Sequence, residues 1–303
     1  MSYDLLVIAG PTASGKTRLA AMVASQIGGE IIGADSRQVY RSMNIGTGKD
    51  YDDYVVEGRR VPVHLIDIAD AGTRYNVFQY QRDFLSAYHD ISSRGVMPIV
   101  CGGSGMYIDS IVRGYRLLPV PVNAELRKRL SGKGLDELRD ILEGYKKIHN
   151  TTDVDTVKRA VRAIEIAEWY SSRPDDEVSF PELKSIVAAV RYARDERRRR
   201  ITERLHSRLS EGMIDEVEQL LDSGVEAETL IYYGLEYKFI TLYITKEISY
   251  SEMVKGLETA IHQFAKRQMT WLRGMERRGT KIHWIEGELP LNDKVEAVKS
   301  LLA

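Results

Sequence analysis

The stretch LLVIAGPTASGKTRLA, residues 5–20, decides the fold class of this 303-residue chain. Gly10, four further residues and then Gly15-Lys16-Thr17 match the spacing G-x-x-x-x-G-K-[ST] of a phosphate-binding loop. An apolar run precedes the loop and a helix-forming run follows it, so we expect strand, loop and helix in that order. Inward-pointing backbone N–H groups, the positive end of the helix and the Lys16 ammonium together favour a polyphosphate ligand. The hydroxyl of Thr17 is expected to orient a magnesium ion or a phosphate oxygen.

Further apolar runs along the chain end in polar or glycine-rich turns. One run ends at Asp35, a second ends at Asp67, and a third over residues 97–101 leads into Gly102-Gly103-Ser104-Gly105. Between the second and third runs, the apolar residues of 75–93 have the spacing of a helix. Alternating strands and helices predict a parallel sheet, at whose carboxyl edge these turns meet the phosphate loop. We therefore expect an α/β fold, a P-loop NTPase-like parallel sheet flanked by helices.

The pattern changes after the third of these units. Residues 121–181 contain helical segments only, which predicts a small all-helical insertion domain between core segments 1–120 and 182–303. The core resumes with strand character in SIVAAVRY (185–192), and the aromatic-rich stretch 232–253 is interpreted as core packing. After the strand at 185–192, helices are expected at residues 195–211, 213–222, 251–275 and 292–302.

Composition excludes several classes of protein. A formal net charge of −1 excludes a uniformly basic nucleic-acid binder, so any RNA contact must come from basic clusters at 126–129, 194–200 and 264–278. For 194–200 a solvated helix face is an equal alternative. The single cysteine, Cys101, is expected to be a buried thiol, which suits a reducing cytosol. Without a long apolar span or a Cys/His cluster, we expect a cytoplasmic protein that has no membrane partner and no zinc site.

Asp35 stands about twenty residues after the phosphate loop and opens the segment DSRQVY. Its carboxylate is placed to face whatever lies beyond the terminal phosphate. In a kinase it would hold magnesium or a substrate hydroxyl, and in a transferase it would take a proton from the attacking nucleophile. A structural role, in which Asp35 caps the next helix, is the third interpretation.

Five segments in combination resemble the tRNA dimethylallyltransferase family, also called tRNA isopentenyltransferases or IPP transferases. They are GPTASGKT (10–17), DSRQVYRSMNIGTGK (35–49), HLID (64–67), GGSGMY (102–107) and AKRQMTWLR (265–273), and they occur in family order along almost the whole chain. The resemblance implies transfer of a dimethylallyl group from dimethylallyl diphosphate to N6 of the adenosine just 3′ of a tRNA anticodon, A37, with release of pyrophosphate. It also implies Mg²⁺ as cofactor and the tRNA anticodon stem-loop as partner, and we expect a monomer.

The resemblance assigns catalytic roles to three residues. Asp35 would accept the N6 proton, Thr12 would reach the bridging oxygen, and Lys16 with magnesium would stabilise charge on the leaving pyrophosphate. Thr17 would be the metal ligand. The implied diphosphate-binding residues are Gly10, Pro11, Thr12, Ala13, Ser14, Gly15, Lys16 and Thr17.

The adenosine must be flipped out of its stacked loop to reach such a pocket, which requires protein on both sides of the RNA. The resemblance therefore implies tRNA contacts from the segment after the second strand, from the insertion and from a C-terminal helix. The implied residues are Asp35, Ser36, Arg37, Gln38, Ser104, Arg127, Lys158, Arg159, Arg162, His262, Lys266, Arg267 and Gln268.

Several positions depart from the family's usual pattern. Ser104 replaces a common Thr, Ile261-His262 replace a common Thr-Arg, YYGLEY (232–237) lacks the usual Gly-Tyr pair, and PVHLID keeps one of two common histidines. Three alternatives stay open on the sequence: an ATP-dependent P-loop kinase, prenyl transfer to free adenine nucleotides, and a non-catalytic RNA-binding module. The helical insertion and AKRQMTWLR disfavour the kinase, and the paired basic segments favour tRNA over free nucleotides.

Overall fold

The computed structural model describes residues 3–148, 154–173 and 180–303. This part of the chain forms two compact units, one of residues 1–115 with 181–303 and one of residues 116–180. We expected the insertion at 121–181. The larger unit is called the core unit below, and the smaller is called the helical unit.

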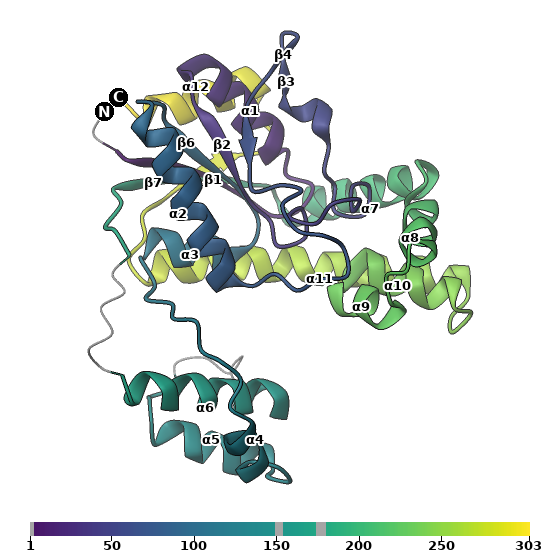
Figure 1. Cartoon of the computed structure of the whole chain (residues 1–303). Coiled ribbons are helices and arrows are strands. Elements are labelled where there is room, and N and C mark those ends of the chain that lie inside the picture. The colour runs from purple at the N-terminus through teal and green to yellow at the C-terminus, as the bar shows by residue number, and fades with distance from the viewer. Residues whose placement is uncertain (1–2, 149–153, 174–179) are drawn as a thin grey trace. The chain divides into compact units, whose positions relative to one another are not determined.

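A parallel sheet organises the core unit (Figure 1). In the described residues, six strands pair in the order β5-β2-β6-β1-β7-β8, and every pairing is parallel. Their bounds are β1 Leu5–Ala9, β2 Glu30–Ala34, β5 Val63–His64, β6 Pro98–Gly102, β7 Ser185–Arg191 and β8 Ile282–Glu286. Four of them are apolar and almost wholly buried, as expected for strands that are covered on both faces.

Helices cover both faces of this sheet (Figure 1). Helices α1 (Lys16–Ile27) and α12 (Leu291–Ser300) pack on one face, where they share a core with alternate side chains of the strands. Helices α2 (Val77–Ser93) and α3 (Gly105–Val112) lie against the other face. A short hairpin, β3 (Val55–Val56) with β4 (Arg59–Arg60), follows the 3-10 turn η1 (Tyr51–Tyr54). The expected α/β class is confirmed.

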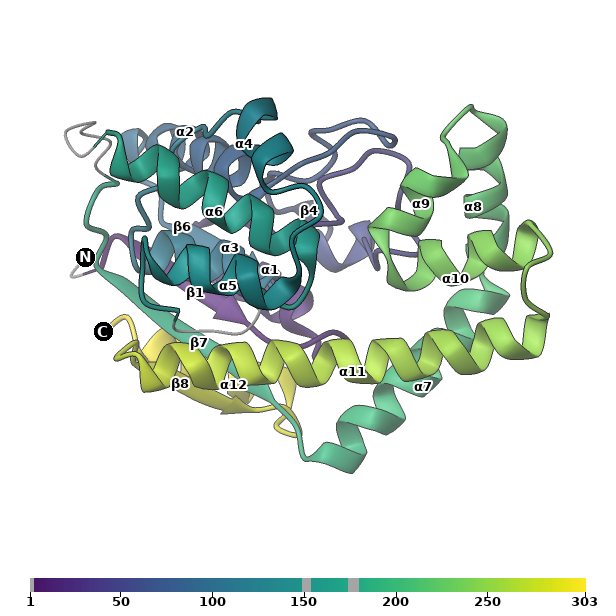
Figure 2. The same ribbon diagram turned by 90° about the horizontal axis from the view of Figure 1, so that it is seen from below.

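Five further helices build a second hydrophobic core beside the carboxyl edge of the sheet. It includes Val39, Tyr40 and Met43 from the segment that follows β2. Figure 2 shows the long helix α11 running alongside α7 and α10. The five helices are α7 (Arg194–Ser210), α8 (Met213–Asp222), α9 (Ala227–Tyr233), α10 (Leu235–Ile244) and α11 (Tyr250–Arg277).

The helical unit has its own apolar core. Its helices in the described residues are α4 (Ala124–Arg129), α5 (Leu135–Glu143) and α6 (Val157–Ser171). Leu126, Leu138, Leu142 and Ile164 are almost fully buried among them. A core of this kind allows the unit to hold its shape through its own packing.

The sequence pattern misses some elements. The strand expected to reach Asp67 ends at His64, because Leu65 and Asp67 adopt positive φ values of 60° and 55° that leave the strand conformation. Strand β8 was not predicted, and neither were α9 and α10 in the aromatic-rich stretch. In β8 the sequence IHWIE mixes polar and apolar residues, which weakens its strand signal.

Candidate functional site

The phosphate loop lies between β1 and α1, as the sequence predicts. Ala13 and Gly15 have positive φ values of 59° and 73°, which turn the backbone into the curl that such a loop needs. Lys16 opens α1 and its Nζ lies 3.3 Å from the carbonyl oxygen of Pro11, so the ammonium is folded over the loop. Burial lowers the pKa of Lys16, while nearby Asp35 is among the charges that oppose this shift.

The far side of the loop is fixed by a residue from α11. Gln268, only 6% exposed, accepts a hydrogen bond from the Thr12 N–H at 2.8 Å and donates one to the Gly103 carbonyl at 3.0 Å. The same amide thus joins the phosphate loop to the glycine-rich turn after β6. This structural role was not predicted for Gln268, and its expected contact with tRNA stays a prediction.

Asp35 follows β2 directly and lies at the carboxyl edge of the sheet, beside the phosphate loop. Its Oδ1 accepts hydrogen bonds from the N–H groups of Arg37 at 2.9 Å and Gln38 at 3.4 Å. Asp35 therefore caps a turn and not the helix that was considered, and these two bonds also orient the carboxylate. In the described part of the chain, Oδ2 receives no hydrogen bond, so it is available to a ligand. Ser104 stands at the N-cap position of α3, but its side chain makes no capping hydrogen bond to that helix. Its hydroxyl oxygen instead accepts a hydrogen bond from the Ser36 N–H at 2.9 Å.

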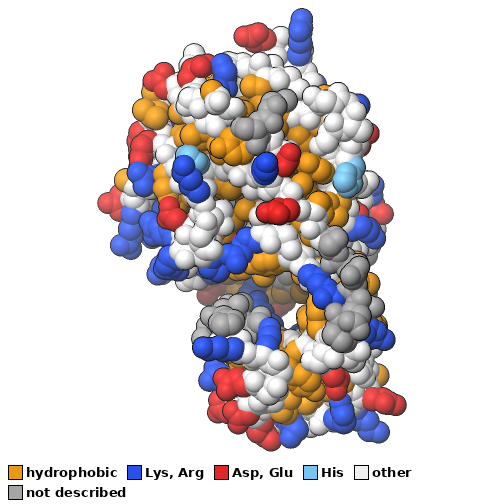
Figure 3. All heavy atoms as spheres, turned by 90° about the vertical axis from the view of Figure 1, so that its left-hand side faces the viewer, with side chains coloured by type: hydrophobic (Ala, Val, Ile, Leu, Met, Phe, Trp, Pro, Cys, Tyr) orange, Lys and Arg blue, Asp and Glu red, His pale blue; other side chains and the backbone are white. Residues whose placement is uncertain are grey.

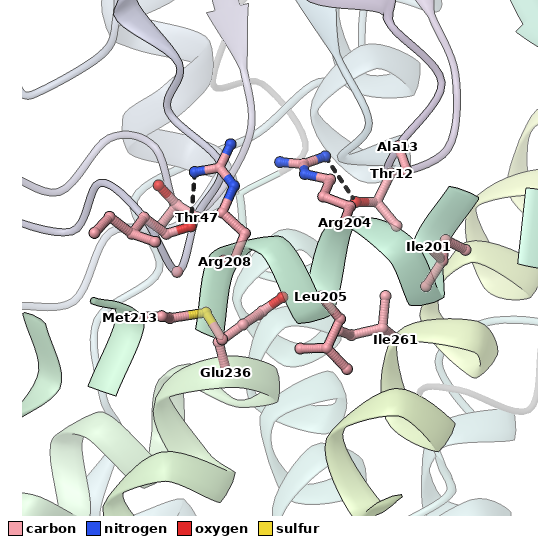
Figure 4. Close-up of a pocket in the computed structure, with 12 residues that line it drawn as sticks. Thr12, Ala13, Thr47, Ile201, Arg204, Leu205, Arg208, Met213, Glu236 and Ile261 are labelled. Carbon is pink, nitrogen blue, oxygen red and sulfur yellow. Dashed lines mark hydrogen bonds between the residues drawn. The ribbon is translucent and has the colours of Figure 1, made fainter. Parts of the chain in front are cut away.

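A cavity opens next to the phosphate loop (Figure 4). Its walls come from the loop, from the segment after β2 and from four helices, and it encloses about 380 Å³ of space including open solvent. Arg204 and Arg208 of α7 present their guanidinium groups on one side, and apolar side chains lie on the other. The lining residues are Thr12, Ala13, Ile45, Gly46, Thr47, Ile201, Arg204, Leu205, Arg208, Met213, Glu236 and Ile261.

Arg204 links α7 to the phosphate loop. Its Nη1 lies 3.5 Å from the hydroxyl oxygen of Thr12, and burial lowers the pKa of its guanidinium. A Cβ at Gly48 would lie 1.6 Å from Arg204 Nη2, and Gly48 also has a φ of 65°, so only glycine leaves room for this arginine. Arg208 is held by the carboxylate of Asp50 and by the Ile45 carbonyl at 3.3 Å.

Glu236 brings a carboxyl group into the same cavity. Burial raises the pKa of Glu236 to about 7, although nearby Arg204 opposes the shift. The preceding residue, Leu235, has a φ of 44°, a conformation that a branched side chain rarely adopts.

The wall formed by residues 44–48 is anchored from behind. The carboxylate of Glu216 on α8 accepts the N–H groups of Asn44, Ile45 and Gly46 at 2.8, 2.7 and 3.0 Å. Tyr237 donates its hydroxyl to the same carboxylate at 2.7 Å. Such a buried carboxylate with four donors rigidly fixes the backbone that it binds.

An ion pair with a buried lysine secures the segment between Asp35 and the wall. The Lys49 ammonium, whose side chain is fully buried, donates to Asp67 Oδ1 at 2.5 Å and to the Tyr40 carbonyl at 2.7 Å. Gln38 spans the segment by donating to the carbonyls of Thr47 and Gly48 at 3.2 and 3.0 Å. Asp67 is therefore a supporting residue at the rim.

The basic residues of α11 differ in exposure. Lys266 and Arg267 are exposed, and Arg267 lies with its guanidinium carbon 5.9 Å from the Phe264 ring centroid. The His262 side chain is only 9% exposed and lies 3.4 Å from Glu258 on the same helix and 3.4 Å from Thr202 on α7. The structure thus turns His262 toward α7, and its expected contact with tRNA stays a prediction.

In the helical unit, three of the predicted tRNA residues are engaged with carboxylates. Arg127 and Arg162 share the buried Glu165, and Arg159 pairs with Asp155, while Lys158 is exposed. Burial alone would raise the pKa of Glu165, but hydrogen bonds from the two arginines and a backbone N–H bring it down to about 2. On the face that Figure 3 shows, Lys and Arg side chains of this unit are interspersed with Asp and Glu.

Sequence reasoning missed Arg204, Arg208, Glu216 and Glu236 as site residues. The basic run RDERRRR (194–200) did indicate that α7 contributes to the site. Arg199 pairs with Glu196 and Glu203 in solvent, whereas Arg200 donates to the Ala13 carbonyl of the phosphate loop at 3.1 Å. One helix thus has a solvated face and a face toward the phosphate loop. Cys101 is buried as expected, and burial raises the pKa of its thiol to about 12.

Membrane-crossing helices and metal-binding clusters are both absent from the described ranges. No helix there combines the length and apolarity that crossing a bilayer requires. Nor do three or more His, Cys, Asp or Glu side chains there converge in a way that would bind a metal ion.

A parallel sheet with a phosphate loop after β1, an acidic residue after β2 and an arginine-lined cavity defines a phosphate-loop enzyme of the α/β class. Residues 38–275 match the model of the family described as IPP transferase, and the chain belongs to this family.

Relatives and solved structures agree with this membership. Over 300 residues the chain is 58% identical to tRNA dimethylallyltransferase 2 of Bacteroides fragilis, covering 99% of this chain and 98% of that protein. The crystal structure of a tRNA isopentenylpyrophosphate transferase from Bacillus halodurans, 27% identical, matches with a TM-score of 0.72 over 98% of this chain and 95% of the other. That of a tRNA delta(2)-isopentenylpyrophosphate transferase from Staphylococcus epidermidis, 28% identical, matches with a TM-score of 0.70 over 98% of both chains.

Proposed function

We propose that this enzyme transfers a dimethylallyl group from dimethylallyl diphosphate to N6 of the adenosine 3′ of a tRNA anticodon, A37, and releases pyrophosphate. The observation that carries the proposal is the two-sided cavity, with the phosphate loop and two arginines on one side and apolar side chains on the other. A diphosphate joined to a five-carbon chain has the same two-sided chemistry. Family membership supports the same conclusion.

The charged side of the cavity acts on the leaving group. As the bond between carbon and the bridging oxygen breaks, negative charge builds on the pyrophosphate. Lys16 and Arg204 are already desolvated, so their charges interact with that anion more strongly than they would in water. The Thr12 hydroxyl, whose oxygen lies 3.5 Å from Arg204 Nη1, would donate to the bridging oxygen.

Asp35 acts on the nucleophile. The exocyclic nitrogen of adenine is a weak nucleophile because its lone pair is delocalised into the ring, so orientation and removal of its proton both matter. The two backbone N–H groups that bind Oδ1 hold the carboxylate in place and leave Oδ2 to accept the proton. Asp35 and the cavity both lie at the carboxyl edge of the sheet, so the proposed proton acceptor and the proposed diphosphate site share that edge.

Magnesium suits the oxygen donors at this site. The Thr17 hydroxyl lies in the first turn of α1, next to the loop that would hold the diphosphate, and hydroxyl and phosphate oxygens are ligands that Mg²⁺ prefers. Thr17 would hold the ion together with diphosphate oxygens, and the ion would add positive charge against the leaving group.

The exposed Lys266 and Arg267 of α11, together with Lys158 of the helical unit, support binding to the phosphates of an anticodon stem-loop. Arg127, Arg159 and Arg162 keep nearly two fifths or more of their side chains exposed despite their ion pairs, so they retain donors for phosphate. We also propose that the enzyme acts as a monomer in the cytoplasm.

A labelling experiment tests the proposal against its alternatives. The purified chain is incubated with labelled dimethylallyl diphosphate and Mg²⁺ and with unmodified tRNA, AMP or ATP in separate reactions. Label in tRNA at the adenosine 3′ of the anticodon supports the proposal. Label in AMP or ATP alone would establish prenyl transfer to free nucleotides, and turnover of ATP without a prenyl donor would establish a kinase or ATPase.

The role of Arg204 is tested by comparing two arginine variants on the same helix, α7. Arg204→Ala should slow transfer by about 100- to 1,000-fold, because a desolvated donor to the developing anion is lost. Arg199→Ala is the matched control, since Arg199 lies on the solvated face of α7 and should leave the rate within about twofold. Steady-state kinetics with both substrates would measure the effect, and equal rates for the two variants would exclude Arg204 from the diphosphate site.

A further inference from the structure

Tyr233, at the end of α9, connects the segment that carries Asp35 to a second loop. It is 2% exposed, and its carbonyl accepts a hydrogen bond from Arg37 Nε at 2.7 Å. Its hydroxyl accepts the Gly72 N–H at 2.9 Å and donates to the Thr73 carbonyl at 2.7 Å. The end of α9, the turn after Asp35 and the loop at residues 72–73 are therefore held as one rigid piece.

Tyr232 and Arg74, which are next in the chain to the anchored Tyr233 and Thr73, meet at the surface. Tyr232 precedes Tyr233 and is 53% exposed, and Arg74 follows Thr73 and lies with its guanidinium carbon 4.9 Å from the Tyr232 ring centroid. We call these two side chains the Tyr232–Arg74 platform. Because the backbone on both sides is anchored by Tyr233, the platform is preorganised.

Fold stability does not explain this pair. A tyrosine that only filled the core would be buried, as Tyr233 and Tyr237 are. Across the described residues Arg74 forms no ion pair, whereas the nearby exposed Arg41 pairs with Asp70 at 2.5 Å. The platform thus offers solvent an aromatic face and an uncompensated cation, and both groups stack on nucleobases. Its tyrosine, Tyr232, lies in YYGLEY (232–237), where the chain departs from the family's usual Gly-Tyr pair.

We propose that the Tyr232–Arg74 platform stacks on a nucleobase of the RNA loop beside the adenosine that is presented to Asp35. The inference rests on the proposed function, because it takes the RNA loop as the occupant. The connection through Tyr233 and Arg37 places the platform next to the Asp35 turn. Stacking there would hold a neighbouring base outside the loop and so favour the flipped state of the acceptor adenosine.

Fluorescence of a modified base tests the proposal directly. Anticodon stem-loop RNAs carry 2-aminopurine on the 5′ or the 3′ side of the acceptor adenosine, and stacking on the protein quenches that fluorophore. The variants are Tyr232→Ala, Tyr232→Phe and Arg74→Ala. Tyr250→Ala and Arg41→Ala are matched controls, because Tyr250 is 50% exposed at the start of α11 and Arg41 is paired.

We expect Tyr232→Ala to abolish the protein-induced quenching at one position and to weaken RNA binding about 10- to 100-fold. Tyr232→Phe keeps the ring and should restore both, Arg74→Ala should lose part of both, and the controls should match the wild type. Affinity for dimethylallyl diphosphate and thermal unfolding should not change in any variant.

The proposal is overturned if Tyr232→Ala quenches and binds like the wild type. If the wild type and Tyr232→Ala both bind the stem-loop and transfer the prenyl group, and their KM values for RNA are equal, only the platform proposal is refuted. If the wild type neither binds nor modifies the RNA, the proposed function falls and the platform proposal falls with it.

Discussion

At the scale of single residues, Asp35 shows how one carboxylate serves both structure and chemistry. Its Oδ1 caps the turn at Arg37 and Gln38, while Oδ2 faces no donor in the described chain. The backbone bonds hold the group in one orientation, which a general base needs more than a matched pKa when the nucleophile is a weakly basic amine. Capping of this turn by Oδ1 and acceptance of a proton by Oδ2 are therefore compatible.

Asp35→Asn should separate binding from catalysis. The amide keeps the shape and can still accept the two backbone bonds, but it cannot take the N6 proton, so transfer should fall by about 100- to 10,000-fold. Single-turnover transfer and RNA affinity measured together would show this, with Asp70→Asn as an exposed control. A parallel loss of affinity and rate would instead mark Asp35 as an RNA-recognition residue.

At the scale of elements, the cavity wall at residues 44–48 has little regular structure of its own and depends on its anchors. Glu216 of α8, which also accepts the hydroxyl of Tyr237 from α10, binds the wall at Gly46, and Gln38 binds it at Thr47. Gly46 allows this approach, because a Cβ there would lie 2.8 Å from the Tyr237 hydroxyl. The shape of the cavity is thus set in part by α8 and α10, which supply few of its lining residues.

Glu216→Gln should loosen this wall. An amide replaces one acceptor oxygen with a donor that faces backbone N–H groups, which should lower the free energy of unfolding by about 1–3 kcal/mol. The KM for dimethylallyl diphosphate should rise more than kcat falls, since the wall shapes the cavity and carries no reacting group. Urea unfolding and steady-state kinetics would measure both, with exposed Glu218→Gln on α8 as the control. An unchanged KM would show that the anchor does not shape the site.

At the scale of the whole molecule, a chain of nearly neutral charge carries its basic residues in two separately packed units. In the helical unit, Glu165 gathers Arg127 and Arg162 and organises α4 and α6 around a buried carboxylate. The same two arginines are predicted to contact tRNA. The glutamate therefore both stabilises the unit and fixes the position of its cations.

The stability of this unit should depend on acid. Because hydrogen bonds hold the pKa of Glu165 at about 2, below the ordinary value of 4.5, its stabilisation is present above about pH 4.5 and is lost as the pH falls toward 2. Glu165→Gln should destabilise the unit by about 3 kcal/mol at pH 7 and by less near pH 3. Hydrogen exchange of α4 and α6 in the full chain would measure this, against Glu168→Gln as the more exposed control. A pH-independent difference would contradict the assignment.

The sequence by itself determined five of the six strands of the described sheet, the phosphate loop, the helices that flank them and the place of Asp35. These features depend on residues that are neighbours in the chain, since apolar periodicity, glycine spacing and a helix start are all local patterns. For the same reason the all-helical character of the insertion was predictable. The family resemblance, now established as membership, also rested on short contiguous segments.

Only the tertiary structure decided which side chains complete the site. Arg204 reaches Thr12 across 192 positions, Gln268 reaches it across 256, and Glu216 reaches Gly46 across 170. No local pattern distinguishes such residues from the solvated arginines and glutamates beside them in the same helices. The exposure of Tyr232 and His262 could not be predicted from local sequence either. The packing of α9 leaves the tyrosine exposed, whereas α7 covers the histidine. Burial and long-range approach are properties of the folded chain, and they decide which polar groups meet a substrate and which support the fold.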